Sequence, residues 1–238
     1  MLPFSADQFF AVFADYNRAT WPAPVVAYLA GAAALAAALR GGGEWVGRGV
    51  AVALGAMWVW TGLAYHWAFF ATVNPAAKAF ALAFLAQGAG LLWVGGRRGG
   101  LRFGPPRSRG EVVTGLALVG YAAVLYPLLG RLAGHGWPAA PAFGVTPCPL
   151  TIFTFGVLLL TRGRVSPALL AIPALWSLIG GSAAFLLGVP QDWMLPAAGV
   201  AGVALLLTRH RRSTVADEGQ APVHPARSDR YARTEVPG

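Results

Sequence analysis

A proline-rich break, Gly134-His135-Gly136-Trp137-Pro138-Ala139-Ala140-Pro141-Ala142-Phe143-Gly144-Val145-Thr146-Pro147-Cys148-Pro149, interrupts the apolar sequence and leads into Leu150-Thr151-Ile152-Phe153-Thr154-Phe155-Gly156. It contains the only cysteine of the chain. Pro147 and Pro149 have no backbone N–H, and each disfavours a helical conformation in the residue before it. We therefore expect a non-helical backbone carrying a thiol to meet a membrane-length apolar segment here.

The composition on both sides of this break is that of a membrane protein. Of 238 residues, 56% are hydrophobic and 11% are charged, whereas a soluble domain has about 25% charged residues. The net charge of +9 does not indicate nucleic acid, because the arginines lie in short connectors rather than along a helical face. A single cysteine also excludes an internal disulfide. The bilayer is the expected partner, and a nucleic acid is not.

Apolar runs of about 20 residues are long enough to span the hydrocarbon core as helices. The sequence has seven candidates, at residues 24–39, 50–70, 76–95, 112–130, 147–161, 167–188 and 193–208. The fifth is short, so the number of spans falls to six if that segment is re-entrant. We predict an all-α polytopic bundle over residues 22–208 and a disordered cytoplasmic tail over residues 209–238, which are polar and rich in proline and arginine.

The N-terminal residues 1–21 have the pattern of an amphipathic helix that lies in the membrane interface. Ser5 and Gln8 have the spacing of a capping box, in which each side chain satisfies a first-turn amide. The large aromatic residues that follow fall mostly on one face; they are Phe9, Phe10, Phe13 and Tyr16. Pro22 is expected to end this helix.

The connector charges predict the orientation. If seven segments span and the N-terminus is outside, most arginines lie on the cytoplasmic side, as the positive-inside rule requires; they are Arg40, Arg48, Arg97, Arg98, Arg102, Arg107, Arg109, Arg162, Arg164, Arg209, Arg211 and Arg212. Only Arg18, Arg131 and Lys78 remain on or near the outer side. A fifth segment that did not cross would move Arg162 and Arg164 outside, so we favour a spanning, broken fifth helix.

With this topology the distinctive polar residues gather on the outer side, where they form a hypothetical ligand site. Its members are His66, Asn74, His135, Thr146, Cys148, Thr151 and Asp192. Imidazoles and a thiol suit a soft or borderline metal, so His66, His135 and Cys148 are candidate metal ligands, although no ligand motif is present. Structural roles remain open for each: an interfacial anchor for His66, a turn for His135, packing for Cys148 and a helix cap for Asp192.

The start of the fifth helix and the small residues of the sixth segment suggest two further binding surfaces. If Pro149 occupies the first turn of the fifth helix, the amides of Leu150, Thr151 and Ile152 are expected to be free to bind an anion or a carboxylate. The sixth segment carries small residues at four-residue spacing, Gly180, Ala184 and Gly188. Such a face suits close helix packing, either within the chain or in a homo-oligomer.

Three segments together resemble a known family. They are residues 60–70 with Asn74-Pro75-Ala76, residues 134–156, and residues 175–192. The chain is similar to the bacterial integral membrane family named domain of unknown function 6064, and the resemblance covers about residues 1–208. It implies a multi-pass protein of the bacterial inner membrane, and it supplies no activity, cofactor or catalytic residue.

The leading functional hypothesis is a transporter or solute-binding membrane protein, with a small solute, an anion or a metal ion at the outer site. A membrane-embedded enzyme that uses Cys148 as a redox thiol, or a metal, is an alternative. A membrane assembly protein without a ligand is the other. We favour a protein that is not an enzyme, and the sequence identifies no cofactor.

Overall fold

Helices account for most of the chain in the computed structural model, which describes residues 3–104 and 108–218, with side chains to residue 209. The helical elements are α1 (Ala6–Ala19), α2 (Ala23–Arg40), α3 (Glu44–Trp60), η1 (Thr61–Phe69), η2 (Phe70–Thr72), α4 (Ala77–Gly96), α5 (Arg109–Gly120), η3 (Tyr121–Leu125), α6 (Tyr126–Leu132), α7 (Pro147–Leu159), α8 (Ala168–Leu187), η4 (Pro190–Trp193) and α9 (Met194–Glu218). Two short strands, β1 (Arg102–Phe103) and β2 (Thr161–Arg162), pair antiparallel. The predicted all-α class is confirmed.

Within the described residues, six helical segments are long and apolar enough to cross a membrane, and they correspond to six of the seven predicted runs. They are Ala23–Arg40, Glu44–Thr72, Ala77–Gly96, Arg109–Leu132, Ala168–Leu187 and Pro190–Arg209. Large apolar side chains point outward from several of them; Leu29, Leu82, Leu178 and Val200 are each at least 60% exposed. An apolar outer surface of this kind is what a lipid environment covers. These features are those of a multi-pass membrane protein.

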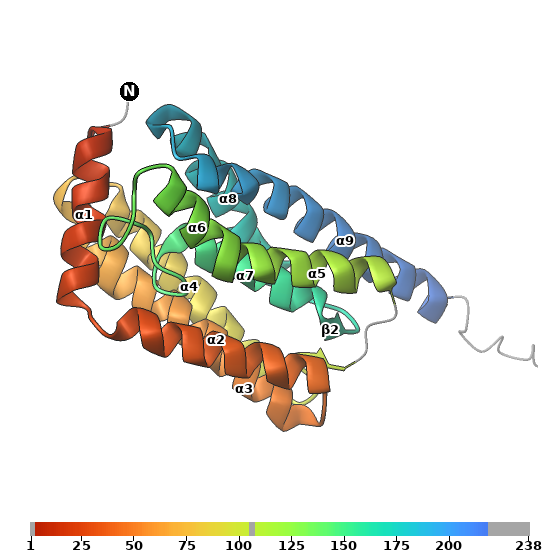
Figure 1. The fold of residues 1–238 in the computed structure, drawn as a ribbon. Coiled ribbons are helices and arrows are strands. Elements are labelled where there is room, and N and C mark those ends of the chain that lie inside the picture. The colour runs from red at the N-terminus through yellow and green to blue at the C-terminus, as the bar shows by residue number, and fades with distance from the viewer. Residues whose placement is uncertain (1–2, 105–107, 219–238) are drawn as a thin grey trace, which may run out of the picture.

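The fifth predicted run forms the short helix α7, which has 13 residues. At about 1.5 Å per residue, such a helix is roughly 20 Å long, shorter than the hydrocarbon core. Every residue of α7 except Cys148 is buried. Its partners lie on all sides: Gly156 meets the backbone of α5, and Phe155 packs against Gly202 of α9. The short fifth segment is therefore the centre of the bundle rather than a peripheral helix (Figure 1).

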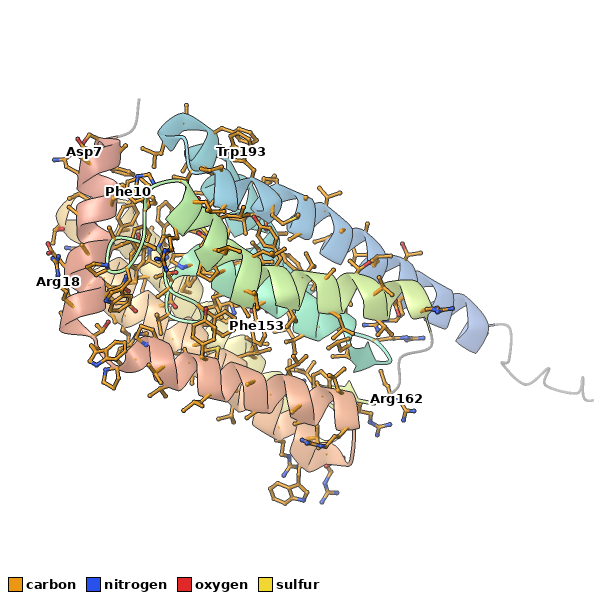
Figure 2. The ribbon with its side chains drawn as sticks, viewed as in Figure 1. Asp7, Phe10, Arg18, Phe153, Arg162 and Trp193 are labelled. Carbon is orange, nitrogen blue, oxygen red and sulfur yellow. The ribbon has the colours of Figure 1, made fainter. Side chains whose placement is uncertain are left out.

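α7 connects the two ends of the bundle. Before it, residues 137–146 lie beneath α1, where Asn17 Nδ2 donates to the carbonyls of Pro138 and Ala140 at 2.6 and 2.8 Å. After it, β2 pairs with β1 from the connector between α4 and α5. Figure 2 shows Arg162 of β2 at the end of the bundle opposite Arg18 and Phe10 of α1. α7 therefore runs from the end of the bundle covered by α1 toward the end that carries Arg162, and whether it counts as a seventh span stays a prediction.

The arginine-rich end is closed by specific contacts. Arg209 of α9 donates to the carbonyl and hydroxyl oxygens of Thr161 at 2.7 and 2.9 Å, and its guanidinium lies 3.7 Å from the buried carboxylate of Glu111. α9 continues to Glu218, beyond the predicted boundary at residue 208. The helix extends because its hydrogen bonds are local and do not depend on apolar residues. The rest of the predicted tail, residues 219–238, lies outside the described residues.

The N-terminal helix forms as its capping pattern predicts. Gln8 N donates to Ser5 Oγ at 3.2 Å, and Ser5 N donates to Gln8 Oε1 at 2.9 Å. Phe10, Phe13 and Tyr16 are buried on one face, and α1 lies across one end of the bundle (Figure 1). The apolar face of α1 therefore covers the ends of the longer helices.

The small residues of α8 pack within the chain. A side chain at Gly180 would meet Leu195 at 2.8 Å, and Ala184 is 2% exposed. At Gly188 the backbone is left-handed, with φ of 67°, and it ends the helix. Gly180 therefore serves the α8–α9 contact and Gly188 the helix end, while a homo-oligomer contact through this face stays a prediction.

Candidate functional site

A cavity of about 160 Å³ lies between α1, the η1–η2 segment, the start of α4 and the second half of α8. Most of its wall is apolar or aromatic, and the aromatic rings come from Phe4, Phe9, Phe13, Tyr65, Phe70, Phe80 and Trp176. Among the few polar groups on the wall are Asn74, Cys148 and Asp192. Three of the seven predicted site residues therefore meet at one cavity, although 118 positions separate Asn74 from Asp192 in the sequence.

Asp192 is placed by the turn between α8 and α9. It lies in η4 and is 2% exposed, and its Oδ1 accepts a hydrogen bond from the Tyr126 hydroxyl. The Cys148 thiol lies beside the same carboxyl group. Asp192 was predicted either as a site residue or as the cap of the last helix. Its side chain is buried in the bundle, and it is the carboxyl group of the cavity wall.

A π-helical segment brings Tyr126 to Asp192. In η3 the hydrogen bonds join residues five apart, so Tyr121 and Tyr126 lie one turn apart on the same side. Both hydroxyls reach the turn between α8 and α9: Tyr121 donates to the carbonyl of Gln191 at 2.7 Å, and Tyr126 donates to Asp192. Sequence analysis missed both tyrosines. The available signal was a pair of hydroxyl groups inside an apolar run, since a buried tyrosine hydroxyl needs a partner.

A second π-helical segment, η1, presents Tyr65 and His66. Tyr65 lines the cavity, whereas His66 is fully buried behind it. The His66 ring packs edge-on against Phe84 and Trp176, with centroid distances of 4.6 and 5.1 Å, and neither ring nitrogen has a hydrogen-bond partner among the residues that the structure describes. His66 is thus an aromatic core residue in contact with the wall residue Trp176.

The remaining candidates lie apart from the cavity. His135 stacks on Phe10 of α1, with ring centroids 3.6 Å apart and nearly parallel planes. The hydroxyls of Thr146 and Thr151 donate to the carbonyls of Ala142 and Pro147, each at 2.8 Å. These side chains stabilise the local backbone. Among the described residues, no three His, Cys, Asp or Glu side chains form a group that could hold a metal ion. His66, His135 and Cys148 do not converge.

The start of α7 also differs from the expected anion site. The helix begins at Pro147 and Pro149 lies in its first turn, as expected, but the amide of Leu150 is not free, because it donates to the carbonyl of Thr146. Proline at the first and third helical positions removes two of the N–H groups that an anion would need. The amides of Leu150, Thr151 and Ile152 therefore lie inside the helix.

Tyr16 of α1 fixes the extended segment that leads to Cys148. Its hydroxyl donates to the carbonyl of Val145 at 2.7 Å and accepts from Trp60 Nε1 at 2.8 Å. Burial raises the pKa of the Tyr16 hydroxyl, so this group stays protonated and remains a donor throughout the physiological pH range. These two hydrogen bonds connect α1 to the end of α3, through Trp60, and to the extended segment before α7, through Val145.

Replacing Tyr16 with phenylalanine should make Cys148 easier to reach. The change removes two buried hydrogen bonds, each worth about 1 kcal/mol, and we expect alkylation of Cys148 by N-ethylmaleimide to become about ten-fold faster. The matched control is Tyr28→Phe, because the Tyr28 hydroxyl donates to the carbonyl of Ala123 instead, at 2.9 Å. An equal rate in wild type and Tyr16→Phe would show that α1 does not limit access.

Comparison with known proteins identifies the family of the chain but no activity. No curated protein and no solved structure matches the chain. A family model described as a family of unknown function, DUF6064, matches residues 6–217. The resemblance seen in the sequence is thus confirmed over nearly all of the described chain, and the chain belongs to the DUF6064 family.

Proposed function

We propose that this protein is a solute-binding membrane protein whose ligand occupies the cavity beneath α1. The observation that supports the proposal is the cavity itself, which has an apolar wall and a buried Asp192 and Cys148 at one side. Ligand sites in proteins commonly combine a mainly apolar wall with a few polar groups that orient the ligand. Transport of that solute, and an orientation with the N-terminus outside a bacterial inner membrane, extend the same proposal.

The cavity wall favours binding over thiol chemistry. A reactive cysteine is usually found near Lys, Arg or His, or at a helix N-terminus, because each of these stabilises the thiolate. Cys148 lies in the first turn of α7, but the residues that line the cavity with it include no Lys, Arg or His and do include the carboxyl group of Asp192. The cavity wall therefore offers no cation to pair with a thiolate, and Cys148 is better suited to line a ligand site than to attack a substrate.

Cys148 provides a test because it is the only cysteine. The neutral probe 3,3-dimethylbutan-1-ol, added to the purified full-length protein, should slow alkylation of Cys148 by N-ethylmaleimide in a saturable way. Ala183→Leu places a larger side chain on the cavity wall and should weaken this protection by about ten-fold, the factor that corresponds to about 1.4 kcal/mol. Ala171→Leu, on an exposed part of the same helix, is the matched control.

The outcomes separate clearly. Saturable protection that Ala183→Leu weakens and Ala171→Leu leaves unchanged would support a ligand site in this cavity. Protection that is not saturable, or that both variants affect equally, would place the effect of the alcohol in the surrounding detergent or lipid and would contradict the proposal.

A further inference from the structure

The ionisable residues on the cavity wall indicate which sign of charge a ligand would carry. This inference rests on the proposed solute site. The wall residues that can ionise are Tyr65, Cys148 and Asp192, and each becomes negative when it loses a proton. No Lys, Arg or His is among the residues that line this cavity. An anionic ligand would meet no complementary charge here, whereas a cationic ligand would meet a carboxyl group.

Asp192 has a hydrogen bond and no cation. Its Oδ1 accepts from Tyr126, and none of the ion pairs found within the described residues involves Asp192. Removing an ionised carboxylate from water without an opposite charge costs several kcal/mol. A ligand that carries a positive charge would provide the missing partner, and Asp192 would in turn select for that charge.

The aromatic wall suits a cation that carries alkyl groups rather than a metal ion. Rings from at least three elements surround the cavity: α1 supplies Phe9 and Phe13, η1 supplies Tyr65, and α8 supplies Trp176. The face of an aromatic ring is negative, and groups of such rings bind quaternary ammonium ions. A small metal ion would need several oxygen, nitrogen or sulfur ligands, whereas this wall is mostly carbon.

Two hydrogen-bond donors on the cavity wall could bind a polar group on the ligand, away from its positive charge. Trp176 is 8% exposed, and its indole N–H lies beside the Cys148 sulfur, a weak acceptor that a ligand oxygen can replace. Asn74 is 9% exposed, and its Oδ1 accepts from the amide of Ala76 at 3.1 Å, which leaves the side-chain NH₂ group as a donor. A hydroxyl or carbonyl oxygen on the ligand could accept from either donor.

We propose that the solute is a small organic ammonium ion, held with its positive nitrogen opposite Asp192 and its alkyl groups against the aromatic wall. The charge of Asp192 and the ring faces both stabilise the cation, so they should act together. The class includes alkyl- and hydroxyalkyl-ammonium compounds, and choline is a suitable probe because 3,3-dimethylbutan-1-ol has the same shape with carbon in place of nitrogen.

The test compares this charged and neutral pair in the purified full-length protein. We expect choline to protect Cys148 from N-ethylmaleimide at a concentration about ten-fold or more below that of 3,3-dimethylbutan-1-ol, the factor that corresponds to about 1.4 kcal/mol. Asp192→Asn should weaken choline protection by about ten-fold and leave protection by the alcohol unchanged. Asp15→Asn, at a carboxylate on the exposed side of α1, is the matched control.

Asp192→Asn keeps an oxygen that can accept the hydrogen bond from Tyr126, so it should fold, and its thermal unfolding temperature checks this. A second variant, Phe80→Leu, tests the ring faces without touching the carboxyl group. It retains apolar surface and should weaken choline protection by about two- to five-fold, as loss of one cation–π contact predicts. The alcohol should be affected much less.

The possible failures are distinguishable. If the alcohol protects as well as choline and Asp192→Asn changes neither, the cavity binds solutes but the ammonium proposal is wrong. If neither probe protects Cys148 at any concentration that leaves the protein folded, both this proposal and the proposed solute site are wrong.

Discussion

Gly156→Ala is expected to destabilise the protein although alanine is the better helix former. A methyl group at Gly156 would lie 2.8 Å from the carbonyl oxygen of Gly115 and 3.1 Å from the amide nitrogen of Val119. Both are backbone atoms of α5, so a side-chain rotation cannot relieve the contact. A methyl group at Gly115 would similarly meet the carbonyl oxygen of Gly156 at 2.8 Å. The two helices approach as closely as glycine allows.

The matched control is Gly120→Ala, at the end of α5, where an added methyl group would meet no atom within 4 Å. Both variants gain the same helix propensity, up to about 1 kcal/mol. Only Gly156→Ala also suffers overpacking, which costs about 1–3 kcal/mol. Unfolding of the two purified variants in the same detergent should therefore differ by about that amount, with Gly156→Ala the less stable. Equal stability would show that α7 is not held at its observed distance from α5.

This prediction concerns α7, the helix that sequence reasoning described least well. The other apolar segments were located because the thickness of the hydrocarbon core sets their length. The prolines Pro147 and Pro149 did predict the break in the fifth segment. The charge pattern also placed this segment between the arginine-rich and the aromatic end of the bundle. The central location of α7 could not be predicted from the sequence, because an apolar helix has the same composition whether lipid or protein surrounds it.

The candidate site was predicted in part for a similar reason. Asn74, Cys148 and Asp192 were grouped because topology placed them on one side, and they do line one cavity. His66 was grouped with them on the same argument, but its ring is rotated into the core. The π-helical segment η1 adds residues to each turn, so positions inferred from a regular α-helix no longer give the direction of a side chain. Tyr126 was missed because η3 has the same effect.

Removing the Tyr126 hydroxyl is expected to lower the free energy of unfolding because Asp192 would lose its hydrogen-bond donor. Asp192 is 2% exposed, so little of its carboxyl group is open to water that could replace the donor. Leaving one member of a buried polar pair unsatisfied costs about 1–3 kcal/mol, and more when that member is charged. Tyr126→Phe should therefore unfold at a lower temperature than wild type in the same detergent. Tyr121→Phe, which removes a hydrogen bond to an uncharged backbone carbonyl, should have a smaller effect.

A variant with both Tyr126 and Asp192 replaced tests whether these two residues stabilise the protein through their mutual hydrogen bond or independently. Asp192→Leu alone should also destabilise, since the Tyr126 hydroxyl would then be buried without its acceptor. When both polar partners are replaced by apolar groups, neither is left unsatisfied, and such double changes are often close to neutral. Tyr126→Phe combined with Asp192→Leu should therefore lose less stability than the two single variants added together, with a coupling of about 1–3 kcal/mol. Additive losses would mean that the hydrogen bond contributes nothing to stability, and that Asp192 is held against the cavity by the packing of η4 alone.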